Sequence, residues 1–197
     1  MTSSLANRYR KGKTVELQAL ATVAPLAGWA IHSSLLARRL ASARRDPLTG
    51  LHTRAAWTTR AERIIRRYRK AAVLLIDLDH FKALNDTYGH AVGDAALVAT
   101  ADRLRTWCGH NGTAGRLGGD EFVAVIHQLT ADGTTALTAA LHRPLIYQGS
   151  ALPLAASVGV CHVSGLPLPA LTDALAAADG AMYAVKGRGR RGSQISR

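Results

Sequence analysis

The sequence has few cysteines and no repeated or low-complexity segments. Its only two cysteines, Cys108 and Cys161, exclude a disulfide framework or a zinc site of paired cysteines, and a reduced, cytoplasmic setting is expected. No Gly-X-Y period, no Ser- or Pro-rich tract and no internal repeat occurs, which excludes collagen-like, mucin-like and solenoid proteins. The hydrophobic fraction of 48% is high enough for a folded core, and 197 residues suit one domain with a short appendage.

Acidic residues are scarce overall, with 13 against 25 basic residues and a net charge of +12. Twenty of the basic residues are arginine, which binds phosphate through two parallel hydrogen bonds, so nucleic acid, nucleotides and anionic lipid are candidate partners. The basic residues concentrate at the two ends, however, and residues 71–185 hold five basic and ten acidic residues. A DNA-binding domain normally spreads its basic residues through the body of the fold. Nucleic acid is therefore not the expected partner, and the chemistry of the middle region depends on carboxylates.

One stretch near the N-terminus, residues 17–37, contains no Lys, Arg, Asp or Glu. It is long enough to span a bilayer, but Gln18, Pro25, His32 and many alanines make insertion unfavourable. We predict an apolar or amphipathic helix in solution or associated with a membrane surface through residues 17–37, with a transmembrane helix as the alternative. Basic residues on both sides of this segment would add attraction to anionic lipid.

Hydrophobic periodicity and turn residues predict an alternating order of helices and strands. Helices are expected at residues 54–69, 81–88, 93–107, 133–141 and 171–186, strands at 71–76 and 156–162, and a hairpin at 115–125 that turns at Gly118-Gly119. This order is typical of an α+β domain whose sheet is covered by helices on one or both faces.

Seven of the 13 acidic residues lie between positions 77 and 121. Asp77 and Asp79 end an apolar strand, where their spacing places them on one face, and Asp120 and Glu121 follow the Gly-Gly turn. If the hairpin lies beside the strand, Asp77 and Asp120 converge, and carboxylates at a strand end are ligands that Mg²⁺ takes while it also holds phosphates. Taken alone, the spacing is explained equally well by a tight turn with solvated or capping aspartates.

Several motifs together resemble the diguanylate cyclase family, whose GGDEF signature is spelled by Gly118-Gly119-Asp120-Glu121-Phe122. The other matching segments are Asp46-Pro47-Leu48-Thr49-Gly50-Leu51, Ile76-Asp77-Leu78-Asp79-His80-Phe81-Lys82, Asn85-Asp86, Tyr88-Gly89-His90, Gly93-Asp94, Ala156-Ser157-Val158-Gly159-Val160, Ala181-Met182-Tyr183 and Lys186 with Gly189-Arg190. The resemblance covers residues 46–191, which leaves a basic N-terminal segment at 1–45 and a basic tail at 192–197. It implies a ferredoxin-like GGDEF domain, similar to the palm of nucleotide cyclases, with a mainly antiparallel central sheet flanked by helices.

The resemblance also implies a reaction, in which two GTP molecules form cyclic di-GMP and pyrophosphate. Each 3′-hydroxyl attacks the α-phosphate of the other GTP, assisted by Mg²⁺ or Mn²⁺, with two ions expected in each site. The implied metal ligands are Asp77, the Leu78 carbonyl and Asp120, with Glu121 as a further candidate. Asp120 or Glu121 would take the hydroxyl proton, and Lys82 is the third implied catalytic residue.

The residues that the resemblance assigns to GTP binding are Phe81, Asn85, His90, Asp94, Gly118, Gly119, Lys186 and Arg190. Asn85 and Asp94 would read guanine, because a carboxylate accepts hydrogen bonds from N1–H and N2–H and an amide pairs with the remaining edge. Simpler roles stay open: Asp94 as a helix cap, His90 as a structural residue, and Lys186 and Arg190 as a solvated basic helix end.

Two further expectations concern regulation and assembly. An Arg-x-x-Asp pair often precedes the signature in this family as a product-binding inhibitory site, but Gly109-His110-Asn111-Gly112 stands here, so that site is expected to be absent. Because one site holds one GTP, the active form is expected to be a homodimer joined through its catalytic faces and the N-terminal helix. The alternative to an active cyclase is a GTP-binding regulatory or interaction module of low activity.

Overall fold

The computed structural model describes the backbone of residues 44–192 and the side chains as far as Lys186. The predicted N-terminal helix, and with it the predicted membrane or dimer element, lies outside the described residues. Within residues 44–192, no helix combines the length and hydrophobicity that crossing a bilayer requires.

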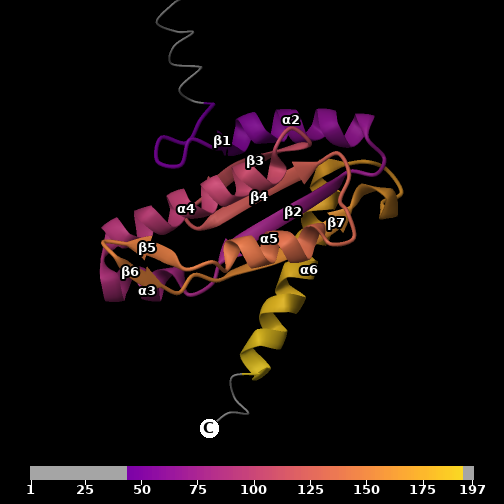
Figure 1. Cartoon of the computed structure of the whole chain (residues 1–197). Helices are drawn as coiled ribbons and strands as arrows, with labels where there is room; N and C mark the ends of the chain where they lie inside the picture. Colours follow the sequence, from indigo (N-terminus) through magenta and orange to yellow (C-terminus); the bar gives the residue numbers. More distant parts are fainter. Residues whose placement is uncertain (1–43, 193–197) are drawn as a thin grey trace, which may run out of the picture. The chain divides into compact units, whose positions relative to one another are not determined.

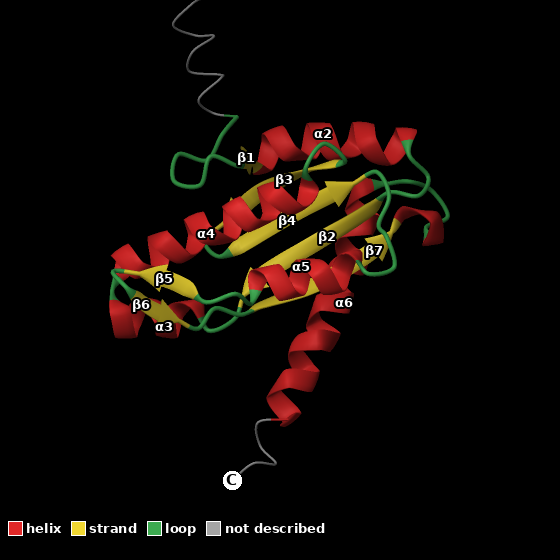
Figure 2. Ribbon diagram, in the orientation of Figure 1, coloured by secondary structure: helices red, strands yellow, loops and turns green. Residues whose placement is uncertain are grey.

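A five-stranded sheet forms the centre of the described region, with the strand order β1-β3-β4-β2-β7 (Figure 2). The strands are β1 (His52–Thr53), β2 (Ala72–Leu78), β3 (Gly112–Gly118), β4 (Glu121–Ile126) and β7 (Ala156–His162). Only the β1–β3 pair is parallel, and β2 pairs antiparallel with both β4 and β7. The apolar sequence of β2 suits this central position, where both faces of a strand are covered. The predicted α+β fold with a mainly antiparallel sheet is confirmed.

Helices cover both faces of the sheet (Figure 1). One face packs against α3 (Phe81–Tyr88), α4 (His90–Cys108) and α5 (Gly133–Leu141), and the other packs against α2 (Arg54–Arg67) and α6 (Leu171–Gly192). Successive residues of β2 point to opposite faces, so Leu74 and Ile76 join the first hydrophobic layer while Val73 and Leu75 join the second. This alternation places Asp77 on the α2–α6 face.

Helix α6 approaches β7 closely because Gly159 has no side chain. A β-carbon at Gly159 would stand 2.0 Å from the carbonyl oxygen of Ala178, which is main chain and cannot move aside cheaply. This close approach fixes the path of α6, which carries Lys186 toward the end of β2.

Two sequence predictions need correction. Helix α4 begins at His90 rather than at Gly93, because Gly89, with a φ of 84°, ends α3 and the chain re-enters a helix at once. Asp94 therefore lies in the second turn of α4, and its alternative role as the cap of that helix is wrong. The sequence analysis also missed a short hairpin of β5 (Leu145–Tyr147) and β6 (Ser150–Leu152), whose three-residue strands are too short to show periodicity.

Candidate active site

The end of β2 lies beside the turn of the β3–β4 hairpin. The sequence analysis named this arrangement as the condition for the Asp77–Asp79 pair to lie near the Asp120–Glu121 pair. Asp77 is the register partner of Glu121, and the Leu78 amide donates to the Asp120 carbonyl over 3.3 Å. Because register partners share a face of the sheet, the side chains of Asp77 and Glu121 lie on the α2–α6 face. Two of the predicted acidic residues thus stand side by side, and Asp120 lies at the adjoining turn.

The Gly118-Gly119 turn is shaped by backbone conformation rather than by crowding. Gly118 and Gly119 have positive φ angles of 153° and 51°, which residues with a β-carbon rarely adopt, and a β-carbon at either would meet nothing within 4 Å. Both residues are exposed, so the main chain of the turn is open to an approaching ligand.

Arg116 holds this turn, and the sequence analysis did not identify it. Its Nε and Nη2 donate to the Gly119 carbonyl at 2.9 and 2.7 Å, and its Nη1 donates to Asp46 Oδ1 at 3.1 Å. An isolated arginine in a strand offers no spacing signal, since its partners lie on two separate turns. Through Arg116, the turn that begins at Asp46 is connected to the GGDEF turn.

The Asp46 carboxylate is the centre of that connection. Its Oδ1 also accepts hydrogen bonds from the Thr49 amide at 2.8 Å and the Thr49 hydroxyl at 2.6 Å. Burial by itself raises the pKa of Asp46, but the hydrogen bonds from Thr49 and Arg116 outweigh it and hold the pKa below its ordinary value. Asp46 is therefore ionised at neutral pH and fixed in place.

Lys186 reaches the predicted metal ligand from α6. Its Nζ lies 2.6 Å from Asp77 Oδ1, and both side chains are largely shielded from solvent. The lysine predicted to contact phosphate thus lies at the carboxylate predicted to contact metal. The other predicted phosphate contact, Arg190, lies further along α6, where the side chains are outside the described region.

Asp79, the neighbour of Asp77 in the acidic motif, has a structural partner. Its Oδ1 accepts a hydrogen bond from the Ser157 hydroxyl at 2.7 Å, and its amide donates to the Ala155 carbonyl at 2.9 Å. These bonds fasten the connection between β2 and α3 to the start of β7. Asp79 therefore stabilises the backbone that follows Asp77.

The donor set fits a hard divalent cation. Asp77 already binds one positive charge, the Lys186 ammonium, and the carboxylates and main-chain carbonyl nearby are the oxygen ligands that Mg²⁺ prefers. Within the described part of the chain, no group of three or more His, Cys, Asp or Glu residues converges as a ready-made cage.

A second cluster lies between α3 and α4 and contains Asn85 and Asp94. The Asn85 Oδ1 is buried and has no hydrogen-bond partner among the described residues, which is an unfavourable state unless a ligand donates to it. A β-carbon at Gly93 would stand 1.8 Å from that oxygen, so the glycine makes the space that Asn85 occupies. Asp94 follows directly and is exposed.

The remaining predicted residues lie along the same two helices. Phe81 packs partly against the core at the start of α3, while Lys82 and His90 are exposed. The α3–α4 cluster and Asp77 belong to opposite faces of the sheet but to the same end of β2. A ligand that contacts both clusters must therefore pass over the end of β2, beside the glycine turn.

Comparison with known proteins identifies the family. Residues 43–192 match the family model described as "Diguanylate cyclase, GGDEF domain". The chain belongs to this family of GGDEF-domain proteins.

Relatives differ in how much of their length the chain covers. It is 71% identical over 180 residues to an "uncharacterized 19.3 kDa protein in repSA 5′ region" of Streptomyces ambofaciens, covering 91% of this chain and 98% of that protein. It is 32% identical over 160 residues to the probable diguanylate cyclase DgcC of Escherichia coli K12, covering 77% of this chain and 43% of that protein. The chain thus spans less than half the length of DgcC.

Among solved structures, a sensory box/GGDEF family protein from Caulobacter crescentus superposes with a TM-score of 0.66 at 36% sequence identity. The match covers 74% of this chain and 99% of that one. The fold described above is therefore the fold of a GGDEF domain.

Proposed function

We propose that this protein condenses two GTP molecules into cyclic di-GMP and pyrophosphate. The observation that carries the proposal is the meeting of Asp77, the Gly118-Gly119 turn and Lys186 at one end of β2. An acidic pair, an open glycine turn and a lysine supply what a triphosphate bound through a divalent cation requires. The family to which the chain belongs supports the same reaction class.

In this proposal, the α3–α4 cluster binds guanine. Asp94 accepts hydrogen bonds from N1–H and N2–H, and the buried Asn85 amide pairs with the adjoining edge of the base. Adenine offers neither donor to Asp94, so ATP is expected to be rejected, because the site's polar groups would be left unpaired.

The phosphates pass over the end of β2 to the second cluster. Lys186 leaves Asp77 for a phosphate oxygen, and Arg190 is the second expected phosphate contact on α6. A divalent cation bound by Asp77, the Leu78 carbonyl and Asp120 would neutralise phosphate charge and favour ionisation of the attacking hydroxyl. The glycine turn lets the main chain come close to the substrate.

The chemical step forms a bond from each O3′ to the α-phosphorus of the other GTP. The bond between that phosphorus and the pyrophosphate oxygen breaks, and pyrophosphate leaves with its electron pair. Asp120 or Glu121 accepts the proton of the 3′-hydroxyl. Because each site holds one GTP, two subunits bring their Gly118-Gly119 turns face to face about a two-fold axis.

The test is incubation of the purified full chain with GTP and Mg²⁺, followed by chromatography of the nucleotide products. Cyclic di-GMP is expected from the native chain and not from Asp77→Asn or Asp120→Asn. Asp173→Asn, an exposed aspartate in the first turn of α6, is the matched control and should retain activity. Synthesis at the native rate by the Asp77 variant would disprove the metal-ligand assignment.

A GTP-binding module of low turnover is the second candidate, and the Asp77–Lys186 ion pair favours it. The Lys186 ammonium, paired with the Asp77 carboxylate, competes with the divalent cation that synthesis needs for the same carboxylate. The same experiment separates the two functions when GTP binding is measured alongside product. Saturable GTP binding without cyclic di-GMP would support the module.

A further inference from the structure

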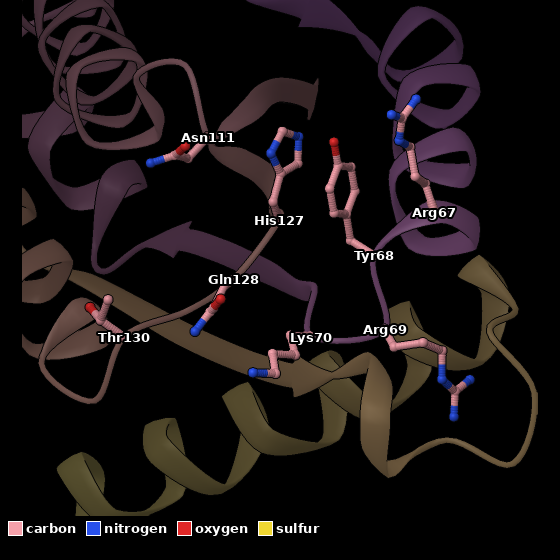
Figure 3. Close-up of a pocket in the computed structure, with 8 residues that line it drawn as sticks. All are labelled: Arg67, Tyr68, Arg69, Lys70, Asn111, His127, Gln128 and Thr130. Carbon is pink, nitrogen blue, oxygen red and sulfur yellow. The ribbon is translucent and has the colours of Figure 1, made fainter.

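A pocket of about 650 Å³ lies at the opposite end of the sheet from the candidate active site. Figure 3 shows the eight residues that line it, which are Arg67, Tyr68, Arg69, Lys70, Asn111, His127, Gln128 and Thr130. They come from the last residue of α2 and the three residues after it, from the residue before β3, and from the segment after β4. All three segments lie near the beginning of β2. Asp77 and the glycine turn lie at the other end of β2, so this pocket is separate from the proposed GTP site.

The charge of the pocket has one sign. Arg67, Arg69 and Lys70 are all exposed, and none of the eight lining residues, each within the described part of the chain, is acidic. The carbonyl end of a helix favours basic side chains, which accounts for Arg67 in the last turn of α2. Arg69 and Lys70 lie after the end of the helix, so the helix dipole does not explain why these two positions are basic. Three cations around one cavity favour an anionic ligand.

The walls of the pocket carry stacked rings. The Tyr68 and His127 rings lie 4.1 Å apart between centroids with planes at 14°, and the Arg67 guanidinium carbon lies 5.7 Å from the Tyr68 centroid. In Figure 3, one face of the His127 ring meets Tyr68, and Asn111 lies on the side of its other face. The His127 amide donates to the Asn111 carbonyl at 2.8 Å, which fixes these two walls relative to each other.

We propose that this pocket binds a nucleotide. The phosphate contacts Arg69 and Lys70, and the base stacks on the face of His127 that lies toward Asn111. The side-chain amides of Asn111 and Gln128 supply donors and acceptors for the base edge. Cations combined with a flat ring recognise phosphate and base together, and the volume falls within the roughly 300–1,000 Å³ of small-molecule sites.

The two arginines of α4, by contrast, are already engaged in contacts. Arg103 donates to the carbonyls of Leu141 and Pro144, and Arg105 donates to the Thr49 carbonyl and pairs with Asp102. Within residues 44–186, the side chains of Arg69 and Lys70 form no hydrogen bond or ion pair. They are therefore available to a phosphate without breaking an existing contact.

The test measures binding by calorimetry, without metal, so that it does not depend on the proposed synthesis. The full chain carrying Asp94→Ala, which weakens the proposed guanine site, is titrated with GMP, guanosine and inorganic pyrophosphate. GMP should bind saturably below millimolar concentration, and Arg69→Glu with Lys70→Glu should weaken binding at least tenfold. Arg54→Glu with Arg63→Glu, the same charge change at exposed positions of α2 outside the pocket, should change it less than twofold.

A second variant tests the base. His127→Ala should weaken GMP binding several-fold and leave pyrophosphate binding unchanged, because only the base contacts the ring. Equal affinity for GMP and pyrophosphate with no effect of His127→Ala would overturn the proposal in favour of a simple anion site. The absence of GMP binding at millimolar concentration would also overturn it. Binding of an eight-nucleotide single-stranded RNA more than tenfold tighter than GMP would overturn the proposal as well, because it would indicate a nucleic-acid-binding surface.

Discussion

Gly93 and Asn85 lie so close together that a β-carbon on the glycine would stand 1.8 Å from the Asn85 side-chain oxygen. The glycine sits inside α4, where its backbone freedom destabilises the helix by about 1 kcal/mol relative to alanine. Its presence there is explained by the space that the neighbouring amide needs. Stability and ligand binding therefore place opposite demands on this position.

Gly93→Ala is expected to separate these two demands. The variant should be as stable as the native chain or up to about 1 kcal/mol more stable, because helix propensity rises and the flexible Asn85 side chain can swing away. Its affinity for GTP, measured by calorimetry, should fall at least tenfold.

Gly180→Ala in α6 is the control for Gly93→Ala, since a β-carbon there meets nothing within 4 Å. It should gain similar stability and keep native affinity. Native GTP affinity in the Gly93 variant would contradict the role given to Asn85.

The Asp77–Lys186 ion pair predicts competition between lysine and metal. Lys186→Met should tighten the binding of Mn²⁺ in the absence of nucleotide by a few-fold, because Asp77 no longer holds an ammonium group. Turnover of GTP should fall, since a phosphate contact is lost. Mn²⁺ binding is measured by electron paramagnetic resonance.

Lys70→Met makes the same charge change near the opposite end of β2. It controls for the effect of net charge on the electrostatic potential of the whole protein. It should leave Mn²⁺ affinity unchanged. If both variants tightened Mn²⁺ binding equally, the effect would come from net charge and not from Asp77.

The Asp46 carboxylate predicts a pH-dependent contribution to stability. Its pKa lies below its ordinary value, so the folded protein binds a proton at this carboxyl more weakly than the unfolded chain does. The contribution is complete above the unfolded-state pKa and is lost as the pH falls through the folded-state pKa. Asp46→Asn should lower the free energy of unfolding by about 1–2 kcal/mol at pH 7.

Urea unfolding as a function of pH checks this expectation. The difference in the free energy of unfolding between the native and Asp46→Asn proteins should shrink as the pH falls from the ordinary pKa of an aspartate toward the lower pKa of the folded carboxyl. Arg116→Ala should cost less in the Asp46→Asn background than alone, because the two residues form one ion pair. Additive costs would show that the pair is not energetically coupled.

Gly159→Ala is expected to destabilise the contact between β7 and α6. The added β-carbon would stand 2.0 Å from the Ala178 carbonyl oxygen, so the helix must shift, at a cost of about 1–3 kcal/mol. Gly165→Ala, where a β-carbon would meet nothing within 4 Å, should have little effect. Thermal unfolding of both variants measures the difference, and equal melting temperatures would contradict the packing argument.

Local signals were sufficient for most of the secondary structure. The helices at residues 81–88 and 133–141 and the strand at 156–162 have the predicted bounds, because apolar periodicity and flanking turn residues are properties of short segments. The start of α4 was misplaced because the conformation of Gly89, which lets one helix follow another directly, has no signature in residue type alone. The β5–β6 hairpin was missed for a similar reason, since its turn uses Gln148 and Gly149 at positive φ in place of a common Asn-Gly pair.

By itself, the sequence determined the family, the order of the elements and the residue types at the candidate site. Motifs and hydrophobic periodicity involve residues that are close together in the sequence, so they can be identified without the tertiary structure. Only the tertiary structure decided which distant residues meet: Lys186 with Asp77 across 109 positions, and Arg116 with Asp46 across 70. It also decided that the two candidate clusters lie on opposite faces of one strand end, and that the residues after α2 form a basic pocket with His127. The physical reason is that such contacts depend on how the helices pack on the sheet. That packing is determined by all the side chains of the core together, and no short sequence pattern predicts it.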